Sequence, residues 1–253
     1  MKRFFDDMRL SLRDLGVRGT LQRLPDYFDM LAEMRKPRSK LSLEVEAERF
    51  DERYGTDTEQ LLTFSEHGIL ANSSSSYVHP YQCATESSIA ESIRALSIDY
   101  EKFSFLDLGC GKGKPILVAS RFPFRRLIGV DISERCLDIA RENVRRCSSF
   151  CEPSRVTLLQ EDAEKLVFPA EPLVIYLFNP FPENVMQVVV KNLEASVRES
   201  PREVAIIYLF PFFEKSLEES EIFGRLPTSQ YFTSVFATKP VGWAWPRNPD
   251  SKK

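Results

Sequence analysis

A glycine-rich stretch at residues 103–115, FSFLDLGCGKGKP, most strongly constrains what this 253-residue chain can fold into. It begins with an apolar run of strand length, continues with glycines at every second position, and ends with Pro115 placed for a first helical turn. Because glycine has no Cβ atom, the backbone can turn sharply here and approach a ligand. The stretch therefore predicts a ligand-binding corner in an open α/β sheet.

The spacing of Gly109, Gly111 and Gly113 restricts the class of ligand. A dinucleotide site needs G-x-G-x-x-G, so that the pyrophosphate rests on the helix N-terminus, but here the third glycine comes one residue early. Lys114 occupies the position where the dinucleotide pattern would have its third glycine. Asp107, shortly before the first glycine, suits a ligand with an ammonium group and repels a pyrophosphate. The P-loop pattern G-x-x-x-x-G-K-[S/T] is also missing from this stretch.

A second apolar run at residues 127–130 ends in Asp131, about 20 residues beyond the first glycine, where a doubly wound fold places an acidic residue over ribose hydroxyls. A carboxylate suits two vicinal hydroxyls because it accepts hydrogen bonds from both. Ser133 predicts the N-cap of a helix that runs to about Cys147. The sequence thus predicts a β-α-β unit with Asp131 at its ligand-binding edge.

Further apolar runs continue the alternation of strands and helices. Residues 156–159 predict a third strand, which leads into an acidic turn. Leu173–Phe178 is a continuous apolar run, as a buried parallel strand requires, and the sequence NPFP follows it. A helix is predicted over residues 183–198 and a fifth strand over residues 204–210. Residues 230–238 and 241–245 predict a closing antiparallel pair.

As a set, these motifs resemble bacterial class I S-adenosylmethionine (SAM) methyltransferases of undefined substrate. Residues 107–114, 124–130 and 177–181 carry the patterns D-x-G-x-G-K-G, F-R-x-x-I-G-V and L-F-N-P-F in that order. The resemblance covers roughly residues 50–210. It implies an α/β fold with a Rossmann-like, seven-stranded, mostly parallel sheet, helices on both faces and an antiparallel C-terminal hairpin. It also implies S-adenosyl-L-methionine as the cofactor.

The resemblance assigns roles along the edge of the sheet. Asp107 and the glycine loop would hold the methionine moiety, and Asp131 the ribose. An acidic residue after the third strand commonly meets the adenine amino group, and Asp162 occupies that position, with Glu161 as a rival. The candidate cofactor-binding residues are Asp107, Gly109, Cys110, Gly111, Gly113, Asp131, Ile132, Asp162, Ala163 and Asn179.

The NPFP sequence supplies the candidate catalytic residues, Asn179 and Phe181. It resembles the N/D-P-P-Y/F motif of SAM-dependent N-methyltransferases, although the aromatic ring and the second proline have exchanged places. Methyl transfer is an in-line displacement, so the nucleophile must be held close behind the sulfonium methyl. An Asn oxygen can accept an amine N–H and aim its lone pair. Phe181 could face the cationic centre.

These observations predict an enzyme that methylates an unidentified acceptor, most simply the amine nitrogen of a protein lysine or a small molecule. O-methylation of a small molecule and a catalytically inactive SAM-binding partner subunit stay open as alternatives. The glycine spacing and Asp107 count against a nicotinamide-dependent oxidoreductase. Candidate acceptor-pocket residues come from an aromatic segment before the first strand and from the fifth strand's end: His79, Tyr81, Gln82 and Phe212, with Tyr208 and Phe213 as further walls.

Composition limits the remaining possibilities. The net charge is −3, which gives no basis for bulk nucleic-acid binding, and no apolar run reaches membrane-spanning length. The five cysteines lack paired C-x-x-C spacing and neither His is at a metal-ligand interval from them, so we expect no metal and a cytoplasmic location. Residues 1–58 predict a helical N-terminal extension and linker, which could form a homodimer, and residues 59–253 the methyltransferase domain.

Overall fold

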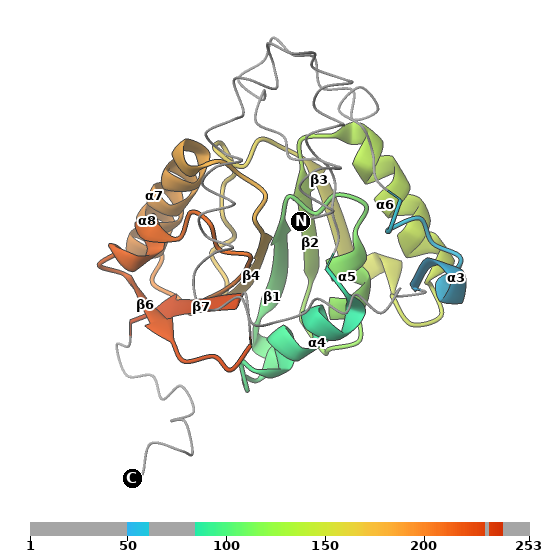
Figure 1. Cartoon of the computed structure of the whole chain (residues 1–253), viewed down its shortest axis with the longest axis horizontal. Coiled ribbons are helices and arrows are strands. Elements are labelled where there is room, and N and C mark those ends of the chain that lie inside the picture. Colours follow the sequence, from blue (N-terminus) through green and yellow to red (C-terminus); the bar gives the residue numbers. More distant parts are fainter. Residues whose placement is uncertain (1–49, 61–83, 231–232, 240–253) are drawn as a thin grey trace.

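The computed structural model describes residues 50–60, 84–230 and 233–239 of the chain (Figure 1). Over these ranges the strands form one seven-stranded sheet in the order β3-β2-β1-β4-β5-β7-β6. The strands are β1 Ser104–Leu108, β2 Leu127–Asp131, β3 Val156–Gln160, β4 Leu173–Phe178, β5 Val204–Leu209, β6 Phe223–Leu226 and β7 Thr233–Thr238.

The first five strands pair in parallel, whereas β7 is antiparallel to both β5 and β6. The order 3-2-1-4-5 is that of a doubly wound sheet, in which the chain reverses its direction of travel between β1 and β4. The predicted mostly parallel, Rossmann-like sheet is therefore confirmed. Ligands of such sheets bind outside the carboxyl ends of the strands at this switch point.

Helices cover both faces of the sheet (Figure 1). Their bounds are α3 Phe50–Tyr54, α4 Glu86–Arg94, α5 Lys114–Ala119, α6 Glu134–Arg146, α7 Glu183–Glu199 and α8 Lys215–Glu218. Apolar side chains of α3, α4, α5 and α6 share one core with the sheet, and those of α7 and α8 share the other. In β1, Phe105 faces the first core and Leu106 the second, as the pleat of a strand requires.

The predicted N-cap Ser133 is confirmed, and Thr85 caps a second helix. The Thr85 hydroxyl accepts a hydrogen bond from the Ser88 amide at the start of α4, and the Ser133 hydroxyl accepts one from the Cys136 amide at the start of α6. Each cap satisfies an N–H group that has no partner inside its own helix. Ser133 thereby fixes where the chain turns from β2 into α6.

The predicted antiparallel C-terminal pair is confirmed, with β6 as a partner strand that the sequence did not predict. The strand expected at residues 230–238 is β7, and its antiparallel neighbours are β5 and β6. Strand β6 has the sequence FGRL, which is short, contains a glycine and gives little strand signal. Residues 241–245, the expected partner, lie outside the described residues.

The sequences YLFNPF and YLFPFF at the ends of β4 and β5 are similar, but their matching residues do not lie side by side in the sheet. In the sheet Leu177, not Tyr176, lies beside Tyr208. This offset of one residue sends the two tyrosines to opposite faces. Tyr176 therefore lies in the core beneath α4 and α5, and Tyr208 lies in the core beneath α7 and α8.

Residues 50–60 span the domain boundary expected at position 58, and the division into residues 1–58 and 59–253 stays a prediction. The expected helices of residues 1–36 and the homodimer that they would form lie outside the described residues. A search of the described residues found neither a helix suited to crossing a membrane nor a His, Cys, Asp or Glu cluster suited to a metal ion.

Candidate active site

The turn between β1 and α5 is built from glycines in the left-handed region. The φ angles are 77° at Gly109, 51° at Gly111 and 83° at Gly113. Side chains with a Cβ atom rarely adopt such angles. The alternating glycines of the sequence therefore serve this backbone path, which brings the amides of the turn to the carboxyl edge of the sheet.

The turn after β1 touches the turn after β4. A Cβ atom on Gly109 would lie 2.5 Å from the Cβ atom of Pro180, closer than any real contact. Gly109 and Pro180 follow strands that are direct neighbours at the switch point. The glycine motif and the NPFP motif, far apart in the sequence, thus form one site.

Asp107 lies under this turn with almost no exposed surface. In the sheet it is flanked by Gly129 and Tyr176, and its Oδ2 atom has no hydrogen-bond partner among the described residues. Burial, reinforced by the neighbouring Asp131 carboxylate, raises the pKa of Asp107 well above its ordinary value. A buried carboxylate oxygen without a partner is unfavourable, so a cationic ligand group would satisfy it. The site therefore fits the ammonium group of SAM.

Asp131, at the end of β2, holds the glycine turn from the other side. Its Oδ2 accepts a hydrogen bond of 2.8 Å from the Gly111 amide, and its Oδ1 accepts one of 2.8 Å from the Ser133 amide. Desolvation raises the pKa of Asp131, and these amides oppose the rise. Each carboxylate oxygen has a further lone pair for a ribose hydroxyl. The adjacent Ile132 is 38% exposed, which suits a covering for a flat base.

Cys110 takes a different position from the other predicted cofactor residues. Its side chain is buried, and a Cβ atom on Gly129 would lie 2.9 Å from its Sγ atom. Burial and the two nearby aspartates raise the pKa of its thiol well above the ordinary value. The thiol is thus a packing group against β2, and any contact of Cys110 with a cofactor would use its backbone.

The acidic turn after β3 lies beside Asp131. The Glu161 amide donates a hydrogen bond of 3.1 Å to the Asp131 carbonyl oxygen. Asp162 accepts one of 3.0 Å from the Glu164 amide, and its other oxygen lies 3.5 Å from Lys165 Nζ. Ala163 is buried. Asp162 is partly exposed and Glu161 is exposed, so both side chains are accessible to a ligand. Their contact with adenine stays a prediction.

Asn179, immediately after β4, has a φ of 42°, a strained value for a residue with a side chain. Its Oδ1 accepts a hydrogen bond of 3.1 Å from the hydroxyl of Tyr208, which is fully buried. Burial raises the pKa of Tyr208, so the phenol stays protonated and donates. Tyr208 was expected to line an acceptor pocket, but it is a core residue that orients Asn179.

Three phenylalanines lie at the ends of β4 and β5 or shortly after them. The ring centroids of Phe178 and Phe210 are 5.4 Å apart, and those of Phe210 and Phe212 are 6.5 Å apart. All three are partly exposed. Phe181 and Phe213 are also partly exposed and pack against the core beneath α7 and α8. Their expected roles, Phe181 in catalysis and Phe213 as a pocket wall, stay predictions. His79, Tyr81 and Gln82 lie outside the described residues.

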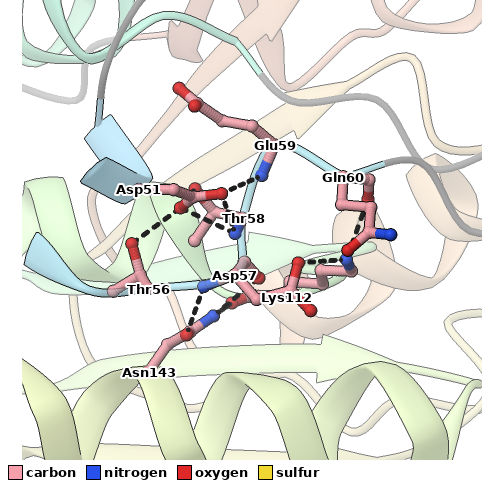
Figure 2. A network of polar contacts seen from close by, with 8 residues as sticks. All are labelled: Asp51, Thr56, Asp57, Thr58, Glu59, Gln60, Lys112 and Asn143. Atoms are coloured by element: carbon pink, nitrogen blue, oxygen red, sulfur yellow. Dashed lines mark hydrogen bonds and ion pairs between the residues drawn. The ribbon is translucent and has the colours of Figure 1, made fainter.

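The sequence did not predict the role of several residues in and around the glycine turn. Lys112 and Lys114 are buried and pair with residues 57–60. Asn143 of α6 bonds to Asp57 and to Lys112 (Figure 2). Lysines beside glycines resemble ligand-binding residues in sequence, and their distant partners leave no local signal. Asn143, a polar residue among the buried positions of an amphipathic helix, was the one available hint.

The family model of a methyltransferase domain matches residues 105–200. The chain is similar in structure to magnesium protoporphyrin IX methyltransferase from Synechocystis with bound SAM, at 16% identity and a TM-score of 0.45, over 61% of this chain and 79% of that one.

Two further structures illustrate the range of similar proteins. Ribosomal protein L11 methylase from Lactobacillus delbrueckii is 15% identical, with a TM-score of 0.44, over 62% of this chain and 80% of that one. TrmN from Thermus thermophilus is 18% identical, with a TM-score of 0.44, over 61% of this chain and 48% of that one. The search of curated proteins found no match.

Proposed function

We propose that this chain is a class I SAM-dependent methyltransferase that transfers the methyl group to an amine nitrogen of a protein lysine or a small molecule. The observation that carries this proposal is the position of Asn179, whose side-chain oxygen is held by Tyr208 beside the glycine turn. The rest of the site is consistent with it.

The described residues offer a place for each part of SAM. The unpartnered oxygen of Asp107 would bind the ammonium group, and the left-handed glycines would let the backbone approach the methionine moiety. Asp131 would accept hydrogen bonds from the ribose, while Ile132 and Asp162 would meet the adenine. Bound there, SAM supplies an electrophilic methyl group on a sulfonium.

Asn179 would position the acceptor. A carbonyl oxygen has two lone pairs, and the Tyr208 hydroxyl uses one of them, so the second can accept an amine N–H. The hydrogen bond from a buried phenol fixes the amide plane and thereby the direction of that second lone pair. A neutral amine held in this way attacks without a strong base, and catalysis rests mainly on proximity.

The aromatic row of Phe178, Phe210 and Phe212 supports a flat or apolar group next to the reacting amine. Aromatic rings pack well against flat groups and attract cations above their faces. A lysine side chain has an apolar stem, and a small aromatic amine has a flat ring. Both acceptors would therefore fit this row.

The first experiment titrates the purified protein calorimetrically with SAM, S-adenosylhomocysteine and NAD. We expect the first two to bind with dissociation constants on the order of micromolar, and NAD not to bind. Binding of NAD alone would contradict the proposal. Transfer of labelled methyl from SAM would then be followed into cell extract, lysine-containing peptides and small aromatic amines and phenols, so that N- and O-methylation are distinguished.

The Asn179→Ala variant tests the role of the amide. We expect methyl transfer to slow by about 10²-fold, as misplacement of reacting groups does elsewhere, with SAM affinity nearly unchanged. The exposed Gln187→Ala on α7 is the matched control and should leave the rate as in the wild type. A full rate in Asn179→Ala would show that another group positions the acceptor.

A further inference from the structure

Two lysines of the glycine turn, Lys112 and Lys114, are 0% and 1% exposed. A buried ammonium group loses its hydration and needs partners inside the protein. Lys112 Nζ donates to Asp57 Oδ1 at 2.6 Å and to the Gln60 carbonyl oxygen at 2.8 Å. Lys114 Nζ lies 3.2 Å from Glu59 Oε1. These partners come from residues 50–60, far earlier in the chain, which we name the clamp segment.

A second link joins the clamp segment to the same turn. Asn143 of α6, 1% exposed, accepts a hydrogen bond of 2.9 Å from the Asp57 amide. Its Nδ2 donates bonds of 3.0 Å to the carbonyl oxygens of Asp57 and Lys112. Figure 2 shows this amide between the two backbones. Residues 57 and 112 are thus connected both by an ion pair and through one buried amide.

The clamp segment has its own internal support. Asp51 accepts hydrogen bonds of 2.7–2.8 Å from the hydroxyl groups of Thr56 and Thr58 and from the amides of Thr58 and Glu59 (Figure 2). Burial acts to raise the pKa of Asp51, but these bonds outweigh it and the pKa is lowered. The bonds close the segment into a compact turn, which presents Asp57 to the glycine turn in a fixed position.

The glycine turn needs such support. Lys112 lies between Gly111 and Gly113, and glycines populate many backbone conformations in addition to the one observed here. Asp131 fixes Gly111 on one side, and the clamp segment fixes Lys112 on the other. A site that is already in its binding conformation loses less entropy when a ligand binds, and it binds more tightly.

We propose that the clamp segment holds the glycine turn in the conformation that binds SAM, with Lys112, Asp57 and Asn143 as positioning residues. The proposal rests on the proposed function, because it concerns the same cofactor site. It makes residues that precede the family-matched region 105–200 part of that site. It also means that Lys112 and Lys114 bond to the clamp segment inside the protein and do not bind the carboxylate of the cofactor.

The central test is a pair of variants. Asp57→Ala removes the Asp57 carboxylate from the buried Lys112 ammonium group, and it should destabilise the fold as well as the turn. The double variant D57A/K112M removes the buried charge along with the clamp. We expect it to recover stability relative to D57A while its dissociation constant for S-adenosylhomocysteine stays about tenfold above the wild type, equivalent to about 1.4 kcal/mol.

The matched control is Arg141→Gln, on the same helix α6 as Asn143. Arg141 is exposed and forms ion pairs of 2.7 Å with Glu134 and 2.8 Å with Asp138, away from the clamp segment. Affinities are measured calorimetrically at a temperature where circular dichroism shows every variant folded. Arg141→Gln should bind like the wild type. Wild-type affinity in both D57A and the double variant would overturn the clamp but leave the proposed function intact.

A second readout follows from linkage. If the clamp segment favours cofactor binding, bound cofactor must stabilise the clamp segment to the same extent. Hydrogen exchange at the amides of Thr58 and Glu59 should therefore slow when S-adenosylhomocysteine is added to the full chain. Unchanged exchange with ligand bound would overturn the clamp. Absence of ligand binding by the wild type would instead overturn the proposed function, and the clamp with it.

Discussion

At the scale of single residues, the site depends on carboxylates that are unfavourable in the empty protein. Asp107 is buried with an unpartnered oxygen, and its pKa is raised by burial and by Asp131. Functional sites often contain groups of this kind, since a ligand can supply the missing partner. Without a bound ligand, the protein is therefore expected to be less stable than the same fold with a neutral group at position 107.

Asp107→Asn tests this conflict between stability and binding. Below the ordinary pKa of an aspartate, folded and unfolded chains both hold the proton. As the pH rises from there towards the raised pKa of the folded state, the unfolded chain releases its proton first, so the wild type loses stability. The variant has no such loss, so its advantage in melting temperature should widen towards neutral pH, by about 2–4 °C per kcal/mol. Melting curves across this pH range provide the measurement.

The same variant should bind SAM poorly, because one charge-assisted hydrogen bond is lost, worth about 1.5–3 kcal/mol. Gln187→Ala serves again as the control for affinity. If Asp107→Asn were less stable than the wild type at neutral pH, the buried carboxylate would have a partner that its geometry does not show. If it bound SAM normally, Asp107 would not contact the ammonium group.

Asp131→Ala removes the hydrogen bonds from the Gly111 and Ser133 amides as well as the expected contact with the ribose. The Gly111 amide loses its acceptor, and the ribose loses its expected partner, so SAM affinity should fall by about 1.5–3 kcal/mol for each charge-assisted bond. Calorimetric titration of SAM measures the loss. An adenosine titration isolates the ribose contact, since adenosine lacks the methionine moiety. Unchanged affinity for both ligands would remove Asp131 from the site.

At the scale of elements, the ends of β1 and β4 are in direct contact, and Gly109 makes this contact possible. Gly109→Ala would place a methyl group against Pro180 and also strain the backbone at a φ of 77°. We expect it to destabilise the fold by about 1–3 kcal/mol and to weaken SAM binding. Chemical denaturation and calorimetry measure the two effects.

Gly55→Ala separates the two causes. Gly55 has a φ of 66°, but a Cβ atom there would meet nothing within 4 Å. It should therefore show the backbone strain without the steric clash, and it should cost less stability than Gly109→Ala. Equal losses in the two variants would mean that the contact between the β1 and β4 turns contributes little.

The sequence predicted those elements whose signals are local. Five parallel strands followed apolar runs, and Ser133 marked a helix start because a cap needs only its own neighbours. Strand β6 was missed because its stability comes from pairing with β7, not from its FGRL sequence. The role of Tyr208 and the burial of Lys112 could not be predicted either, since both depend on partners that are distant in the sequence.

At the scale of the whole molecule, the fold extends beyond the family-matched region 105–200 on both sides. Strand β5 is buried along its entire length and lies between β4 and β7. A fragment of residues 84–200 would expose the edge of β4 and much of the core beneath α7. We expect this fragment to be insoluble, or to be unfolded when measured by circular dichroism, and a chain of residues 50–239 to fold. A soluble fragment 84–200 that unfolds cooperatively would contradict this expectation.

The ion pair between Asp57 of the clamp segment and the buried Lys112 also has an evolutionary consequence. Lys112 is fully buried, so loss of the carboxylate at position 57 leaves a charge in the interior, whereas loss of both groups does not. Descendants of this sequence should therefore change positions 57 and 112 together, or keep both. Covariation between positions 57 and 112 among related sequences would be evidence of the same physical coupling.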